Sequence, residues 1–245
     1  MKKLYLLVIL ILLSKFSLAY DKADTTFTYD LNGDGKKEKI KTVIKEDEGT
    51  ITLKVNDAAF TYIPTSTTDT ELKVIWIKEK VYLMSTNIDY YGYESTLFSF
   101  SSKIDSIGTF WSLDRPEISN SGIIKVNDWL GFWSADYEYQ LINNKLTAKY
   151  KDEYTNFDNL KEHEIKTTEM IYLHSGKMLN AKGLYEIKPN TRIYILKADI
   201  RELCKEEDSW REGCNWYYIR SKDGTEGWIM LKDFQDKVEG IPWAG

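Results

Sequence analysis

Apolar and polar residues alternate in short runs along most of the chain, and clusters of Gly, Asn, Asp and Ser separate the runs. Successive side chains of a β-strand point to opposite faces, so this period of two predicts strands with one buried face. The strands expected before residue 151 are Phe27–Tyr29, Lys39–Lys45, Thr50–Val55, Ala58–Ile63, Leu72–Ile77, Lys80–Ser85, Thr96–Ser101, Ile107–Trp111, Gly122–Val126, Tyr137–Ile142 and Lys145–Tyr150.

The alternation stops at 152–167, which is charged and poor in β-branched residues. This composition predicts a linker, with a short helix possible over Asn156–Glu164. The strands expected after it are Thr168–Leu173, Gly183–Ile187, Thr191–Lys197, Asn215–Ser221 and Gly227–Leu231. The chain is therefore expected to be all-β, with an antiparallel β-meander over 20–151 (part of a propeller, or a sandwich), a small domain over 168–236 and a tail over 237–245.

The first 19 residues have the pattern of a secretory signal peptide. Lys2 and Lys3 precede an apolar run over Leu4–Leu13, and Ser17-Leu18-Ala19 supplies small residues for cleavage. The run is shorter than the roughly 20 apolar residues of a spanning helix. We expect a secreted or periplasmic protein that meets the membrane only through this cleaved segment; an uncleaved anchor is the alternative.

Charge and histidine content narrow the classes of function. The 245-residue chain has a net charge of −5, and cleavage after Ala19 would remove three more lysines. This balance argues against a nucleic-acid partner, which requires a basic face. Only two histidines are present, His163 and His174, so hydrolytic and metal-based sites that depend on imidazole are disfavoured. Both are expected to be solvated.

The chain has two cysteines, Cys204 and Cys214. In an exported protein a close, even pair favours a disulfide, which would stabilise the fold by about 3 kcal/mol in the chain-entropy model. Free thiols are the alternative. The bond would staple an acidic loop over 198–213.

The segment Asp30-Leu31-Asn32-Gly33-Asp34-Gly35-Lys36-Lys37-Glu38 places oxygen-bearing side chains at alternate positions of a glycine-rich loop. Such a loop can gather oxygen ligands around Ca²⁺. The candidate ligands are Asp30, Asn32, Asp34, the carbonyl oxygen of Lys36, and Glu38. The twelfth position is Lys41, where an EF-hand requires Glu, so the loop is not an EF-hand. A plain hairpin turn is the alternative.

The pattern D-x-N-x-D-G-x-x-E before a strand resembles the calcium loops of FG-GAP and VCBS-type β-repeats in exported bacterial proteins. Only this one motif carries the resemblance. Ser119-Asn120-Ser121-Gly122 lacks the acidic residues of a second loop, so a full propeller is not expected.

The clearest motif lies near the C-terminus, where W-Y-Y-I-R-S-K-D-G-T-E-G-W-I spans 216–229. It predicts two strands around the turn Asp223-Gly224. The motif resembles the closing hairpin of bacterial SH3-like (SH3b) domains. Two further segments match that family: Leu173-His174-Ser175-Gly176, at the start of the family's first loop, and 184–196, where Asn190 replaces the usual Gly.

The SH3b resemblance implies a small SH3-like barrel that binds peptidoglycan stems or short peptides in an aromatic groove. The aromatic residues at matching positions are Tyr172, Tyr185, Trp210, Trp216 and Trp228. Two departures weaken this transfer: Lys177-Met178 stands where the family has proline, and the loop over 198–213 is longer than usual. For Trp216 and Trp228, a place in the core is the alternative.

Other aromatic and acidic residues offer a rival function. Tyr90, Tyr91 and Tyr93 surround a glycine turn, and Trp129, Phe132, Trp133, Tyr137 and Tyr139 follow. They could stack on sugars, but aromatic residues at strand parity usually fill a β core. The carboxylate pairs Asp89 with Glu94 and Asp136 with Glu138 could serve a glycoside hydrolase.

We expect an exported, non-enzymatic protein whose SH3b-like domain recognises peptidoglycan or an envelope protein. A carbohydrate-active hydrolase that uses one of the carboxylate pairs is the first alternative. An inhibitor or assembly factor of an envelope enzyme, acting through the acidic loop, is the second.

Overall fold

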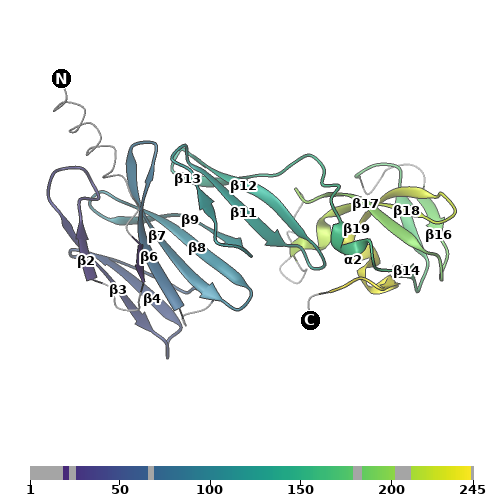
Figure 1. Ribbon diagram of the computed structural model, residues 1–245, viewed down its shortest axis with the longest axis horizontal. Helices are drawn as coiled ribbons and strands as arrows, with labels where there is room; N and C mark the ends of the chain where they lie inside the picture. Colours follow the sequence, from purple (N-terminus) through teal and green to yellow (C-terminus); the bar gives the residue numbers. More distant parts are fainter. Residues whose placement is uncertain (1–18, 22–25, 66–68, 179–183, 202–210, 244–245) are drawn as a thin grey trace, which may run out of the picture. The chain divides into compact units, whose positions relative to one another are not determined.

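The computed structural model describes residues 19–21, 26–65, 69–178, 184–201 and 211–243 (Figure 1). These residues fold almost entirely into antiparallel strands, which confirms the predicted all-β class. The chain divides into two compact units. The first unit holds Met1–Asn127 and Glu138–Ala148, and the second holds Asp128–Tyr137 and Lys149–Gly245.

The strands of the first unit form two complete sheets and most of a third. The four-stranded sheet has the order β2 (Thr26–Tyr29), β3 (Glu38–Lys45), β4 (Thr50–Val55), β5 (Ala58–Tyr62). The five-stranded sheet has the order β1 (Ala19–Asp21), β6 (Asp69–Ile77), β7 (Lys80–Asp89), β8 (Gly92–Phe100), β9 (Ile104–Ser112). The third has the order β10 (Glu117–Ile118), β11 (Ile123–Trp129), β12 (Ser134–Ile142), β13 (Lys145–Lys149), and the tip of its β11–β12 hairpin belongs to the second unit.

A single apolar cluster joins the four-stranded and five-stranded sheets. On β4, every second residue is buried, as a strand with one core face requires. The buried members of the cluster are Phe27, Leu31, Ile40, Leu53, Val55, Leu72, Val74, Leu83, Phe98 and Ile104. The alternation read from the sequence therefore corresponds to the packed faces of two sheets.

The second unit contains a five-stranded sheet of order β16 (Leu184–Ile187), β15 (Ile171–His174), β19 (Glu226–Met230), β18 (Trp216–Ser221), β17 (Ile193–Asp199). A two-stranded sheet pairs β14 (Lys166–Thr167) with β20 (Val238–Glu239). Short helical turns complete the unit: η1 (Asp158–Leu160), η2 (Arg211–Cys214), α2 (Leu231–Phe234) and η3 (Gln235–Lys237). Among the described residues no sheet closes into a barrel, so the predicted barrel is not formed as such.

The segment predicted as a linker, 152–167, is part of the second unit's core. Tyr154, Phe157, Leu160 and Ile165 are all buried, and only η1 within it is helical. The predicted tail is also structured, because β20 pairs with β14. The apolar residues of this segment are spaced irregularly, so the sequence shows no periodic pattern that would predict their burial.

Two aromatic residues from the β11–β12 hairpin complete this core. Phe132 and Trp133 are buried, and Trp133 Nε1 donates a hydrogen bond to the Tyr217 hydroxyl at 3.1 Å. The Trp133 ring also packs on Tyr154 and Phe157. The second unit is therefore built from two separate segments of the chain.

The helices within the described part of the chain are all too short or too polar to cross a membrane. The predicted signal segment lies outside the described residues except for Ala19, which begins β1. Its cleavage stays a prediction.

Candidate functional site

The β18–β19 hairpin has two apolar faces. Tyr217 and Ile219 face the core and are fully buried. Trp216 and Tyr218 point to the opposite face of the sheet, as alternate residues of a strand must. Cross-strand partners share a face, so Met230 and Trp228, which pair with Trp216 and Tyr218, lie there too.

On this outer face the aromatic residues form a cluster separate from the core. Trp216, Trp228 and Met230 are its buried members, and Tyr218 packs against them. The Tyr218 and Trp228 rings meet edge to face, with centroids 5.2 Å apart. The second unit therefore has a second, smaller apolar cluster on the face of the sheet opposite Tyr217 and Ile219.

An ion-pair network borders this aromatic cluster. Asp199 pairs with Trp216 in the β17–β18 register, and its carboxylate is buried. It accepts hydrogen bonds from Lys177 Nζ at 2.7 Å and from two nitrogens of Arg201, Nε at 2.8 Å and NH2 at 2.6 Å. The Lys177 ammonium also lies 4.7 Å from the centre of the Trp228 ring, within cation–π range.

The same network sets the ionisation of Asp199. Burial alone would raise its pKa, but the hydrogen bonds from Arg201 and Lys177 outweigh burial and lower the pKa to about 2. The carboxylate is therefore ionised throughout the physiological range. It fixes two cationic side chains at the edge of the aromatic cluster.

Exposed tyrosines surround the cluster. Tyr172 and His174 alternate with the buried Leu173 on β15, and His174 pairs with Trp228, so both point to the outer face. Tyr172 is 44% exposed. Tyr185 is 47% exposed, but it pairs with the core-facing Leu173 in the β15–β16 register, so strand parity places it on the opposite face from Tyr172. Burial raises the pKa of the Tyr218 hydroxyl, and the neighbouring Glu226 adds to that rise.

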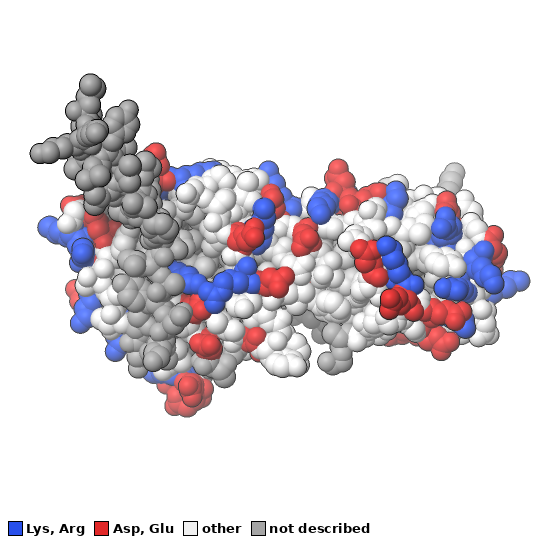
Figure 2. Space-filling model, viewed as in Figure 1, with Lys and Arg blue, Asp and Glu red and all other residues white. Residues whose placement is uncertain are grey.

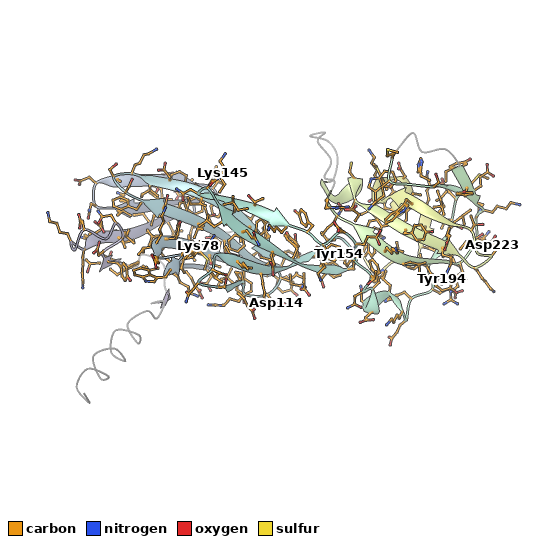
Figure 3. All side chains as sticks on the ribbon, turned by 90° about the horizontal axis from the view of Figure 1, so that it is seen from above. Lys78, Asp114, Lys145, Tyr154, Tyr194 and Asp223 are labelled. Atoms are coloured by element: carbon orange, nitrogen blue, oxygen red, sulfur yellow. The ribbon has the colours of Figure 1, made fainter. Side chains whose placement is uncertain are left out.

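A second exposed tyrosine lies at one end of the face. Tyr194 on β17 pairs with Arg220, close to the turn that holds Asp223 (Figure 3). The guanidinium of Arg192 lies 5.3 Å from the centre of its ring.

The structure separates the five predicted ligand-binding residues into three groups. Tyr172 and Tyr185 are exposed, as a binding role requires. Trp216 and Trp228 are buried in an apolar cluster, as the core alternative predicted, and are not exposed walls. Trp210 and Cys204 lie outside the described residues, and the Cys204–Cys214 disulfide stays a prediction.

His174 corrects an expectation. It is half-buried, and its ring packs edge to face on Trp216 with centroids 5.8 Å apart. Its Nδ1 atom is buried and has no hydrogen-bond partner among the described residues. The prediction that both histidines are solvated is therefore wrong for His174, while His163 is exposed.

Sequence reasoning missed Tyr218, Lys177 and the network around Asp199. Tyr218 could have been found, because it shares the parity of Trp216 on one strand. Lys177 and Asp199 are 22 residues apart, and no local pattern links them. Lys177 follows β15 and Asp199 ends β17, so they meet only when the sheet order β15–β19–β18–β17 has formed.

The predicted calcium loop is a compact turn in which side chains bind backbone amides. The Asp30 carboxylate accepts hydrogen bonds from the amides of Gly33 and Gly35 at 2.7 and 2.9 Å. Asp34 accepts one from Lys36 N at 2.8 Å. Gly33 and Gly35 have φ of 77° and 85°, the left-handed conformation that the glycine-rich motif anticipates.

The remaining predicted ligands complete this loop. Glu38 is buried, and its Oε2 atom accepts a hydrogen bond from Leu31 N at 2.7 Å. Asn32 is exposed and accepts one from Asp34 N. Within the described residues no three acidic, histidine or cysteine side chains converge closely enough to hold a metal. Ca²⁺ also uses amide and carbonyl oxygens, so the calcium site stays a prediction.

The carboxylate pairs considered for catalysis have other roles or belong to different units. Glu94 Oε2 accepts hydrogen bonds from Thr65 N and Thr65 Oγ1 at 2.7 and 2.9 Å, and Asp89 accepts one from Tyr90 N. Asp136 belongs to the second unit and Glu138 to the first.

The aromatic residues considered for sugar stacking differ in burial: Trp129 is exposed, and Tyr93 and Tyr139 are half-buried. Tyr90 and Tyr91 are exposed and meet edge to face. Phe132, Trp133 and Tyr137 are buried, which confirms the core alternative for these three.

No protein-family model, no curated protein and no solved structure matches this chain.

Proposed function

We propose that this chain is an exported, non-enzymatic binding protein whose second unit holds a peptide ligand of the cell envelope. Peptidoglycan stem peptides and segments of envelope proteins are the ligands implied by the SH3b resemblance. The observation that carries the proposal is the outer face of the β16–β15–β19–β18–β17 sheet, where an aromatic cluster is bordered by exposed tyrosines and a fixed ion-pair network.

The order of elements supports the resemblance. Strands β15 and β16 pair as the two arms of a long first loop, and β17, β18 and β19 follow as a meander. The short turn α2 then leads to β20, which pairs back with β14 before the first loop. This sequence of elements is the one expected for an SH3-like domain.

The surface suits a short peptide. Tyrosine gives large contact area at low entropic cost, because only two torsions are immobilised, and its hydroxyl can bond to peptide groups. Buried Trp216 and Trp228 keep the floor rigid. Lys177 and Arg201, held by Asp199, place hydrogen-bond donors at one edge. On the face shown in Figure 2, acidic and basic side chains are interspersed over both units, so shape and local contacts would dominate selection.

The direct test is co-sedimentation of the purified chain with peptidoglycan sacculi, with envelope extracts as a second ligand source. The double variant Tyr172→Ala/Tyr194→Ala should lose at least tenfold in retention, since both side chains are exposed on this face. Tyr90→Ala is the matched control, because Tyr90 is 93% exposed in the first unit. Retention that is absent for the parent chain, or equal for all variants, would contradict the proposal.

A further inference from the structure

The first unit contains a groove of about 1160 Å³ that the proposed function does not use. All four residues of β2 line one side, together with the start of the loop that follows it. The opposite side comes from the β6–β7 turn and from the end of β8. The volume exceeds the roughly 300–1000 Å³ of a typical small-molecule site, so the groove suits an extended ligand.

The floor of the groove is aromatic and held in place. Tyr29, Trp76 and Phe100 are each half-buried and line it. Trp76 Nε1 donates a hydrogen bond to the Tyr29 hydroxyl at 3.0 Å, which fixes both rings relative to each other. Because the Tyr29 oxygen accepts this bond, its own proton is available for a second one.

The rim of the groove is polar and mixed in charge. The neutral groups are hydroxyls and amides, and they come from Thr26, Thr28, Asn32, Ser99, Ser101 and Asn144. The charged groups are Asp30, Lys37, Glu79, Lys80 and Asp105. Since both signs are present, neither a polyanion nor a polycation is favoured over a neutral ligand.

We infer that this groove binds a neutral polysaccharide segment. The C–H faces of a pyranose ring can pack on Trp76 and Phe100, while sugar hydroxyls exchange hydrogen bonds with the Tyr29 hydroxyl and the rim. A uniform apolar ligand would leave the polar rim unpaired, and a charged one would meet like charges on one side. The site lies wholly in the first unit and is independent of the peptide surface on the second.

Native gel electrophoresis through gels that contain dextran, laminarin or galactomannan tests this inference with the purified chain. We expect retardation in at least one of the three. Trp76→Ala should raise the apparent Kd at least tenfold, and Trp76→Phe should retain part of the binding because it keeps an aromatic face. Tyr90→Ala and the double variant Tyr172→Ala/Tyr194→Ala should bind like the parent, because neither change touches the groove.

A second variant guards against loss of fold in Trp76→Ala. Thr28 is exposed and lines the groove, so Thr28→Arg should fill it without disturbing the core. Its melting temperature should match that of the parent while retardation is lost. If none of the three polysaccharides retards the parent chain, or if Thr28→Arg leaves the retardation unchanged, the inference is wrong. Failure of the peptide proposal would leave these gels unaffected.

Discussion

At the scale of single residues, Asp199 is the group whose ionisation contributes most clearly to the second unit. Its pKa is about 2, below the ordinary value of 3.8, because Arg201 and Lys177 outweigh the effect of burial. The unfolded chain therefore takes up a proton at higher pH than the folded chain does. The stabilisation is fully present above pH 4 and is lost as the pH falls through 2.

Asp199→Asn should therefore lower the free energy of unfolding at pH 7 by about 2 kcal/mol and remove this part of the acid sensitivity. Denaturant unfolding between pH 7 and pH 2 would measure both effects. Asp152→Asn is the matched control, since Asp152 also bonds Arg201 but its side chain is 94% exposed. If the two variants behaved alike, the assignment of the effect to Asp199 would be wrong.

Gly227 is the residue at which the structure explains a motif position most directly. A Cβ atom there would lie 2.7 Å from the carbonyl oxygen of His174 and 2.9 Å from Leu173 Cβ. Strands β15 and β19 therefore approach too closely for any side chain at this point. The glycine before Trp228 in the hairpin motif is therefore required for packing.

Gly227→Ala should cost about 1–3 kcal/mol, the usual range for overpacking, and should separate β15 from β19. Thermal unfolding would show the loss. Gly224→Ala tests the alternative that any glycine in the hairpin is sensitive, since Gly224 has open space around it but a φ of 93°. Its loss should come from backbone strain alone and leave the β15–β19 contact intact, as amide exchange of β15 would report.

At the scale of elements, the loop between β2 and β3 is held by hydrogen bonds within the loop itself. Its carboxylates and Asn32 bond backbone amides, so the turn is stabilised whether or not a cation is present. The buried Glu38 anchors the end of the loop to Leu31. A cation would add to this arrangement by binding the remaining oxygen lone pairs.

Asp34→Ala should lower the melting temperature by more in millimolar calcium than in chelator if the loop binds Ca²⁺. Differential scanning fluorimetry under the two conditions measures the difference. Equal losses would show that Asp34 serves only the turn, through its bond to Lys36 N.

How far the sequence predicted the elements depends on their length. Long alternating runs such as β4 and the β18–β19 hairpin were predicted closely, and the left-handed Asn190 was anticipated from its place in a glycine position. The two-residue strands β10, β14 and β20 were missed, because two residues carry no period. The β6–β7 turn has no turn motif in the sequence either, because the positive φ angles belong to Lys78 and Glu79 and not to the usual Asn or Gly.

At the scale of the whole molecule, the second unit is not a continuous stretch of chain. A boundary at residue 151 follows the composition, but Phe132 and Trp133 belong to the core beyond it. Composition can predict which segments are exposed and charged. Which unit a residue packs into depends on contacts between distant parts of the chain, such as the hydrogen bond between Trp133 and Tyr217, 84 residues apart. The aromatic cluster on the opposite face depends on the pairing of β15, β18 and β19, so the sequence predicted Tyr172, Trp216 and Trp228 but not their arrangement.

Trp133→Ala should therefore destabilise the second unit by about 3–5 kcal/mol, the range for removing a large buried aromatic side chain. Trp129→Ala on the same hairpin should cost much less, because Trp129 is 36% exposed. Amide exchange of β18 at increasing denaturant concentration reports the stability of the second unit and separates the two. Similar losses for both would place Trp133 outside this core.

The central claim is that the outer face of the second unit binds a peptide ligand of the envelope. Isothermal titration of the purified chain with a soluble peptidoglycan stem peptide tests it most directly. Saturable binding that weakens at least tenfold in Tyr172→Ala/Tyr194→Ala, and not in Tyr90→Ala, is the predicted result. No heat of binding with stem peptides, together with no retention from envelope extracts, would contradict the account.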